Sequence, residues 1–280
     1  MNRRALLLHR APYGETSLVV EVLSPQDGVR SVLARGAFRP TSRFYAVLDW
    51  FDTLELDWRE RRGSDLALLD SGDRCVLRRR VATNLAAYRA AHAALDSIRS
   101  AARAGRDDGD LFALAERLLD ALDVEDTAAD LELVAFDLRF LDHLGLSPAL
   151  EHCATCGREA PTASDGPARS AFSAECGGRL CRACAVRARD EGARVGLLDR
   201  STLETAARLT RSGPGRLELG SGDMLETERS SVRDFVERFL EYHLERRPKA
   251  RRRLPARRSI RILQPHAADA NRPSSLDRPS

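Results

Sequence analysis

Lysine is almost absent from this chain of 280 residues. Lys249 is the only lysine, so every other member of the combined Lys and Arg total of 45 is an arginine. Such a bias reflects codon composition as much as function, and an arginine alone is therefore weak support for phosphate binding. The formal net charge of +3 does not by itself point to nucleic acid. The stretches that lack acidic residues are more informative than the total charge.

Long hydrophobic runs are also missing. No apolar segment approaches the roughly 18 to 20 residues that cross a bilayer, so no membrane partner is expected. The N-terminal apolar segment is broken by His9 and Arg10, which argues against a signal peptide. We therefore expect the reducing cytoplasm, where paired cysteines favour a metal over a disulfide. The hydrophobic content of 43% is typical of a globular protein, and the length allows more than one domain.

Catalytic motifs are missing as well. The sequence contains no phosphate-binding Walker loop, no Gly-x-Gly-x-x-Gly segment and no carboxylate cluster of the nuclease type. The 6 histidines form no catalytic constellation. Asp107, Asp108 and Asp110 are better explained as a loop that caps the next helix than as a metal site. The sequence therefore predicts a protein that is not an enzyme.

Two cysteine pairs are the most specific pattern in the chain: Cys153 with Cys156, and Cys181 with Cys184. Each Cys-x-x-Cys turn can aim two thiolates at one point, and four thiolates are the closed ligand set of a structural Zn²⁺. A redox pair normally opens a helix after a strand in a βαβ unit, which the flanking sequence does not show. We therefore predict one structural Zn²⁺.

Neighbouring residues add detail to this predicted site. Cys176 precedes Cys181 closely enough to compete as a ligand, and we interpret it as a spare thiol. Four thiolates around Zn²⁺ leave a double negative charge. Arginines nearby could offset this charge: Arg158, Arg179, Arg182 and Arg187.

Strands are predicted in residues 1–80. Residues 17–24 and 29–35 flank a loop of hairpin length that contains Gly28. Residues 53–58 alternate between apolar and polar, and residues 66–69 are a further short candidate. About five strands in this length predict a small closed barrel, of which the OB-fold is the best-known oligonucleotide-binding form.

Helices are predicted from about residue 81. Thr83 or Asn84 caps a helix that extends to about residue 103, and Ser201 with Glu204 matches a capping box. The other predicted helices cover residues 111–122, 131–144, 201–211 and 231–246. The fold class is therefore α+β: a barrel domain, an α-helical domain and a four-cysteine zinc-finger-like insert. The expected bounds are 1–80 for the barrel, 81–150 and 190–254 for the helices, and 151–189 for the insert.

Two segments combine basic residues with an absence of carboxylates. Between Asp27 and Asp49 the basic residues are Arg30, Arg35, Arg39 and Arg43, and Phe38, Phe44 and Tyr45 are interleaved with them. Arginines can bind the phosphate backbone and aromatic rings can stack on the bases, so this combination suits a single nucleic-acid strand. In the alternative, the rings fill the barrel and the arginines are only solvated.

The second basic segment covers residues 246–261 and includes Arg251, Arg252 and Arg253. Phosphates bound there would release counterions, so the affinity would fall steeply with salt. The segment could equally be a solubilising end without a partner. Residues 255–280, rich in Arg, Pro and Ser, are predicted to be a disordered tail.

Three short segments, in this order, resemble the RecO family of bacterial DNA repair proteins. They are Ala-Pro-Tyr-Gly-Glu-Thr at 11–16, Asp27-Gly28, and Ala-Arg-Gly-Ala-Phe-Arg-Pro-Thr-Ser-Arg at 34–43. The resemblance continues through Phe172, residues 177–184 and residues 242–248, and it covers residues 1–254. Ala250 departs from the Ser-Arg pair of many members, so any role of that serine is not carried over.

The resemblance implies a non-enzymatic recombination mediator with an N-terminal OB-fold, located in the cytoplasm on the nucleoid. Members of the family bind single- and double-stranded DNA and anneal complementary strands. They also contact the C-terminal tail of single-stranded DNA-binding protein and act with RecR to load RecA. The DNA contacts expected here are Arg30, Arg35, Phe38, Arg39, Arg43, Arg251, Arg252 and Arg253. The alternatives are a zinc-ribbon adaptor without direct DNA binding and a zinc- or thiol-dependent enzyme.

Overall fold

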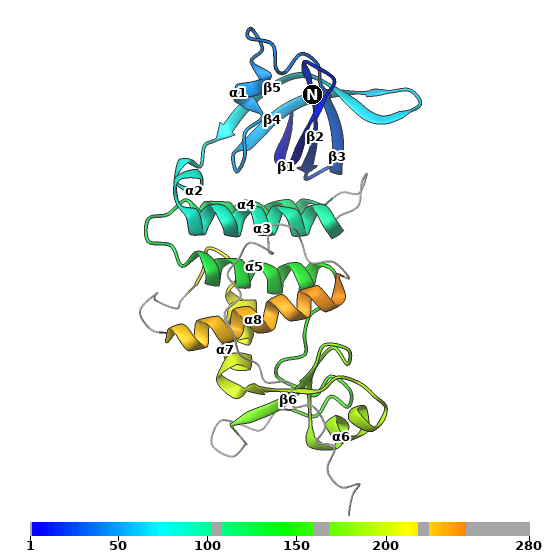
Figure 1. Ribbon diagram of the computed structural model, residues 1–280, viewed down its shortest axis with the longest axis vertical. Coiled ribbons are helices and arrows are strands. Elements are labelled where there is room, and N and C mark those ends of the chain that lie inside the picture. The colour runs from blue at the N-terminus through cyan, green and yellow to red at the C-terminus, as the bar shows by residue number, and fades with distance from the viewer. Residues whose placement is uncertain (1, 102–107, 160–167, 218–223, 245–280) are drawn as a thin grey trace, which may run out of the picture.

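Three parts follow one another along the long axis of the molecule: a β-barrel, a layer of helices, and a small sheet with the two cysteine pairs beside it (Figure 1). The computed structural model describes residues 2–101, 108–159, 168–217 and 224–244. The basic residues 251–253 and the predicted tail 255–280 lie outside these described residues.

The N-terminal part is a closed barrel with the strand order β1-β2-β3-β5-β4. Its strands are β1 (Arg3–Tyr13), β2 (Ser17–Ser24), β3 (Gly28–Ala34), β4 (Thr53–Arg61) and β5 (Ser64–Val76). β3 and β5 pair in parallel and the other neighbours are antiparallel. The short helix α1 (Phe44–Val47) lies in the connection from β3 to β4. This five-stranded closure is that of an OB-fold, so the predicted barrel is confirmed.

The strand that closes the barrel, β1, is not among the segments that the sequence pattern singled out. It pairs with β2 on one side and with β4 on the other. Ala5 and Leu7 point into the barrel core, whereas Leu6 and Leu8 join the core that the barrel shares with the helices. Because both faces of β1 are buried, its sequence shows a continuous apolar run in place of the alternation expected of a half-buried strand.

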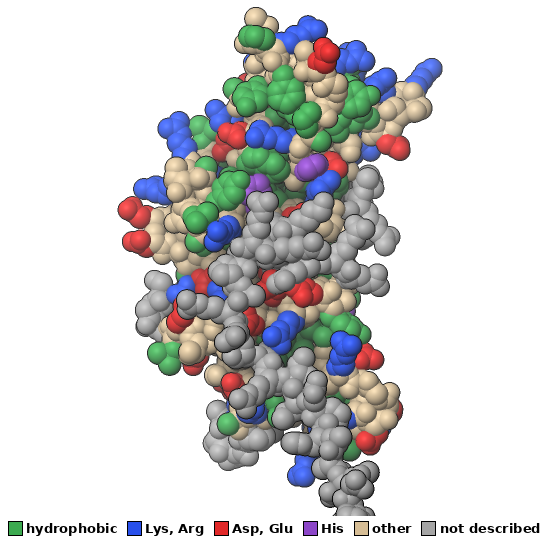
Figure 2. All heavy atoms as spheres, in the orientation of Figure 1, with side chains coloured by type: hydrophobic (Ala, Val, Ile, Leu, Met, Phe, Trp, Pro, Cys, Tyr) green, Lys and Arg blue, Asp and Glu red, His purple; other side chains and the backbone are tan. Residues whose placement is uncertain are grey.

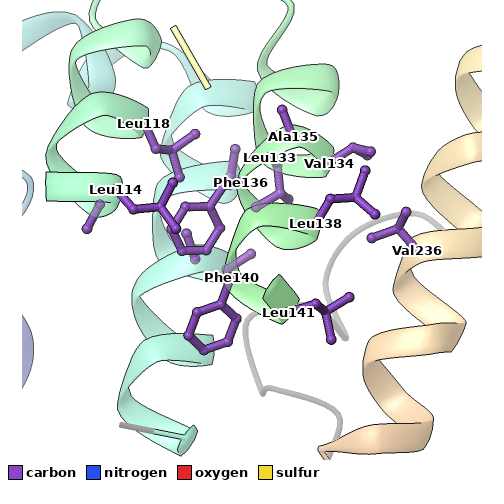
Figure 3. Close-up of a cluster of buried hydrophobic side chains, with 14 of the residues drawn as sticks. Leu114, Leu118, Leu133, Val134, Ala135, Phe136, Leu138, Phe140, Leu141 and Val236 are labelled. Atoms are coloured by element: carbon purple, nitrogen blue, oxygen red, sulfur yellow. The ribbon is translucent and has the colours of Figure 1, made fainter. Parts of the chain in front are cut away.

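The helical layer is built around α5 (Ala129–His143), whose side chains are buried on nearly every side. It packs against α3 (Leu85–Ala101), α4 (Gly109–Leu122), α7 (Arg200–Ser212) and α8 (Glu226–His243). Figure 3 shows Phe136 and Phe140 of α5 between Leu114 of α4 and Val236 of α8. The two rings are stacked with their centroids 5.7 Å apart. Burial of each such side chain stabilises the fold by about 1.5–3 kcal/mol.

Two predicted helix starts are wrong. α7 begins at Arg200 with Asp199 as its N-cap residue, so Ser201 lies inside the first turn and does not cap the helix. α8 begins at Glu226, well before residue 231, and the Glu228 carboxylate accepts a hydrogen bond from the Leu225 N–H at 3.4 Å. Carboxylates in a first turn are favourable because they face the positive end of the helix dipole. The predicted start was placed at the first residue of the apolar pattern and missed this acidic turn.

Asn84 is the residue that caps α3, which follows the short helix α2 (Arg79–Thr83). Its Oδ1 accepts hydrogen bonds from the N–H groups of Ala86 and Ala87, at 2.9 and 3.1 Å. We expect Asn84→Ala to lower the free energy of unfolding by about 1 kcal/mol, because both N–H groups lose their partner. Urea unfolding followed by circular dichroism measures this loss. Asn84→Asp, which keeps an acceptor oxygen, should retain most of the stability, and equal losses in the two variants would contradict the capping role.

A buried arginine joins the barrel to the helices. The Arg78 side chain is 2% exposed. Its guanidinium donates to Asp120 of α4 at 2.7 Å, and to the Phe51 carbonyl and the Thr53 hydroxyl at 2.9 and 3.0 Å. Thr53 in turn donates to the Glu116 carboxylate of α4 at 2.6 Å. Together with the shared apolar core, this network fixes the orientation of the barrel on the helices.

Candidate metal centre and candidate nucleic-acid face

The four cysteines of the two pairs lie around a small sheet with the strand order β7-β6-β8, at the end of the molecule opposite the barrel (Figure 1). Its elements are β6 (Arg169–Ser173), β7 (Gly178–Leu180), α6 (Arg182–Asp190) and β8 (Gly196–Asp199). The first cysteine pair lies in a turn closed by a hydrogen bond from the Gly157 N–H to the Cys153 carbonyl at 2.8 Å. In the second pair, Cys181 directly precedes α6 and Cys184 lies in its first turn. β8 lies beyond residue 189, so this sheet extends past the expected end of the insert.

The four sulfur atoms converge. Their Sγ atoms all lie within 4.8 Å of one another, and the Cys156 and Cys181 sulfurs are 3.8 Å apart. A tetrahedral ion with metal–sulfur bonds of about 2.3 Å requires sulfur–sulfur distances of about 3.8 Å. Cys153 and Cys184 are buried, whereas Cys156 is exposed and Cys181 is half-buried. The four thiols are therefore positioned to hold one metal ion.

Hydrogen bonding makes the thiols of this cluster unequal. Burial raises the pKa of Cys153, but donation from the backbone N–H groups of Cys181, Cys156 and Thr155 outweighs it and lowers the pKa to about 6. The hydrogen bond with Cys181, together with burial, raises the pKa of Cys184 to about 12. The backbone around Cys153 therefore favours the thiolate, which is the form that binds metal.

The predicted neighbours of the cluster have different roles. Arg187 donates to the Cys184 sulfur at 3.3 Å, as expected of a residue that offsets thiolate charge. Arg158 and Arg179 contribute their carbonyl oxygens, which accept from the N–H groups of Cys153 and Ala154 at 2.8 Å. Cys176 is not part of the four-sulfur cluster; it packs against the apolar residues of the insert. Four cysteines therefore form the candidate ligand set.

The cysteine sheet is bonded, on both sides of Gly178, to the segment that follows α5. The Arg179 N–H donates to the Ala149 carbonyl at 2.8 Å, and the Ala149 N–H donates to the Gly177 carbonyl at 3.0 Å. Gly178 has φ +153°, and a Cβ atom there would lie 2.5 Å from the Ala149 oxygen, so the approach needs glycine. Phe172 of β6 also packs edge-on against Phe235 of α8, with the centroids 4.8 Å apart. Because the insert packs on the helical core, a metal ion that stabilises the insert would also stabilise the helices.

A basic loop lies at the outer end of the barrel, between β3 and α1. We call residues 35–43 the arginine loop. Gly36 adopts φ +65°, which turns the chain after β3, and its N–H donates to the Ser17 hydroxyl at 3.2 Å. The Phe38 N–H donates to the Thr16 carbonyl at 2.8 Å. The loop is thus bonded to the turn between β1 and β2.

The arginines of this loop point into solvent. Arg35, Arg39 and Arg43 are exposed, and in the described part of the chain no carboxylate lies within ion-pair distance of any of them. Arg30 differs, because it is half-buried on β3 and pairs with Glu60 at 2.5 Å. Figure 2 shows blue basic side chains over the outer end of the barrel, with green hydrophobic ones among them. Of the four arginines predicted in the first basic segment, three are therefore exposed and make no ion pair within the described residues.

Some aromatic residues near the arginine loop are exposed, as expected of rings that stack on bases, and another packs against the barrel core. Phe44 is half-buried against the barrel core. Phe38 and Tyr45 are 42% and 59% exposed, and their ring centroids are 6.1 Å apart. Tyr13, which was not among the predicted site residues, is 57% exposed at the end of β1. An aromatic residue directly before a tight strand-connecting turn is the pattern that could have indicated it.

Other parts of the described chain add no second candidate centre. Within the described ranges, the four cysteines are the one group of three or more His, Cys, Asp or Glu side chains placed to share a metal ion. None of the described helices has the length and apolar character needed to cross a membrane. The predicted contacts Arg251, Arg252 and Arg253 lie outside the described residues.

Known proteins are similar to this chain along most of its length. Residues 1–75 match the family model described as Recombination protein O N terminal, and residues 82–252 match Recombination protein O C terminal. A protein of Anaeromyxobacter sp. (strain K), named DNA repair protein RecO, is 35% identical over 247 residues, which cover 88% of this chain and 92% of the relative. A protein of the same name from Myxococcus xanthus (strain DK1622) is 32% identical over 248 residues, with 88% and 93% covered.

Proposed function

The chain belongs to the RecO family of DNA repair proteins, and from this premise we propose that it binds DNA through the arginine loop and anneals complementary strands. In this role it takes both single- and double-stranded DNA. It works with RecR and with the C-terminal tail of single-stranded DNA-binding protein to load RecA. The role is that of a mediator without catalysis, carried out in the cytoplasm on the nucleoid.

The arginine loop is the observation that carries this proposal. Its three exposed arginines form no ion pair with a carboxylate of the described residues, so no ion pair with these residues has to break before they bind a phosphate. Guanidinium groups match phosphate oxygens with paired hydrogen bonds. Because the loop is bonded to the turn between β1 and β2, its backbone is already ordered, so binding loses less conformational entropy there.

The other predicted contacts have lesser parts in this proposal. Arg30 has to leave Glu60 before it can bind a phosphate, so its contribution is smaller than that of the loop arginines. Arg251, Arg252 and Arg253 would add charge that attracts DNA without regard to sequence. Phe38 stands beside the loop arginines as an exposed ring.

For the cysteine cluster we propose one structural Zn²⁺ held by Cys153, Cys156, Cys181 and Cys184. The donor set supports this choice, because four thiolates at tetrahedral spacing suit Zn²⁺ and leave no open position for a substrate. The ion would hold together an insert whose own apolar cluster is small.

A titration with single-stranded oligonucleotide at several salt concentrations tests the DNA-binding proposal. Three phosphate contacts predict that log K falls with log salt with a slope of about −2, since each contact to a single strand contributes about −0.7. Fluorescence anisotropy measures the affinity, and a complementary labelled strand reports annealing. A zinc-ribbon adaptor, the competing function, would show no salt-sensitive binding, and that result would refute the proposal.

A further inference from the structure

Three large aromatic side chains are exposed at the outer end of the barrel. Tyr13 ends β1, Phe38 lies in the arginine loop and Tyr45 lies in α1; they are 57%, 42% and 59% exposed. Other rings of the same domain behave differently, because Phe51 and Trp58 are buried and Phe44 packs on the barrel core. The exposure is therefore confined to a few positions and is not a general property of the barrel.

Backbone contacts hold the segments that carry the three rings side by side. The Phe38 N–H is bonded to Thr16, in the turn that directly follows Tyr13, and Tyr13 faces Ser17 across that turn. Phe38 and Tyr45 have their ring centroids 6.1 Å apart with the ring planes inclined by 50°. Phe38 and Tyr45 are therefore ring neighbours, and Tyr13 lies at the end of the strand whose following turn is bonded to Phe38; we call these three residues, which lie beside the exposed arginines, the ring surface.

The charge around the ring surface indicates what could cover it. The loop arginines favour an anion, and the rings favour flat apolar faces. A single nucleic-acid strand offers both, whereas a duplex hides its base faces within the stack. The exposed carboxylate of Glu15 lies in the turn beside Tyr13, so it repels phosphates there. The backbone of a bound strand is therefore favoured on the arginine side and its bases on the ring side.

We propose that Tyr13, Phe38 and Tyr45 form a base-stacking surface that makes the barrel selective for unpaired over paired DNA. This inference rests on the proposed function, since the arginine loop supplies the affinity for phosphates of either form. The rings add a contact that only an unpaired base can make. The selectivity of the site thus resides in side chains distinct from those that supply its charge.

The test compares three probes of equal length: a single-stranded oligonucleotide, a strand of abasic residues with the same phosphates, and a duplex. In the variant Tyr13→Leu, Phe38→Leu, Tyr45→Leu, the affinity for the normal strand should fall about tenfold or more, because stacking is lost. The affinities for the abasic strand and the duplex should change less than about twofold, because their phosphate contacts remain. Leucine keeps apolar bulk while it removes the flat ring.

Two further results make the outcome decisive. Tyr45→Trp, a single conservative change, should show fluorescence quenching by the normal strand and none by the abasic strand. Equal losses for normal and abasic strands in the leucine variant, or no loss for either, would overturn the stacking role; the latter would leave the surface to a protein partner. Replacing the loop arginines should lower the affinity for all three probes. Unchanged affinities in that variant would count against the proposed function and not against stacking.

Discussion

Cys153→Ser is expected to lower the zinc content from one ion per chain to none and to unfold the cysteine insert. Three remaining thiols leave the tetrahedral set incomplete, and structural zinc sites of this type contribute on the order of 10 kcal/mol to folding of small domains. Elemental analysis of protein purified without chelator measures the stoichiometry. A thermal melt reports the stability, and the insert should become sensitive to proteolysis.

The size of this effect follows from how little else holds the insert together. Its buried apolar cluster consists of Leu180, Ala185 and Ala188 with the candidate ligands Cys153 and Cys184. Such a cluster buries too little apolar surface to offset the conformational entropy of the ordered chain. Since β6 packs on α8 through Phe172 and Phe235, loss of the ion should also lower the melting temperature of the helical layer.

Two other cysteines provide matched controls. Cys75 lies on β5, where its thiol donates to the Thr53 carbonyl at 3.3 Å, and Cys176 lies outside the four-sulfur cluster. Cys75→Ser and Cys176→Ser should each keep one zinc per chain. Loss of the ion in Cys176→Ser would show that this residue competes as a ligand. Retention of a full zinc content and an unchanged melt in Cys153→Ser would refute the metal site, as would the absence of metal from the unmodified protein.

The triple variant Arg35→Ala, Arg39→Ala, Arg43→Ala is expected to bind single-stranded DNA about 100-fold more weakly at about 0.1 M salt. Each phosphate contact to a single strand contributes about 0.7 to the salt slope, so removing three should flatten the slope by about 2. Anisotropy titrations over a salt series measure both quantities. The melting temperature should change little, because these side chains are exposed and make no ion pair within the described residues.

A charge-matched control separates the loss of phosphate contacts at the loop from the loss of net positive charge. Arg79, Arg117 and Arg208 are exposed on α2, α4 and α7, outside the arginine loop. Changing these three to alanine alters the net charge by the same amount and should weaken binding far less. Arg30→Ala should fall between the two variants, since Arg30 is paired with Glu60. Equal losses in the two triple variants, or unchanged affinity in the loop variant, would reject the arginine loop as the binding site.

Local sequence patterns predicted many of the strands and helices, because the spacing of apolar residues reflects which face of each element is buried. Period-two alternation and hairpin glycines indicated the middle strands, and apolar residues at helical spacing indicated α3, α4 and α5. The pattern did not indicate β1, since its two faces are buried by different parts of the molecule. Nor did it predict the extent of β5, where Asp70 and Gly72 resemble turn residues but lie in a strand held by pairing with β4.

The sequence by itself determined the four candidate metal ligands, because each Cys-x-x-Cys turn places two thiols together through local geometry. It also determined which segment carries arginines without carboxylates. Only the tertiary structure decided which of these side chains are free: Glu60 from a distant strand pairs with Arg30, whereas the loop arginines stay exposed. The same holds for the rings, since Phe44 packs on the barrel core, whereas Tyr13, Phe38 and Tyr45 stay exposed and the last two are ring neighbours. Burial and pairing depend on contacts between residues far apart in the chain, and a local pattern carries no record of them.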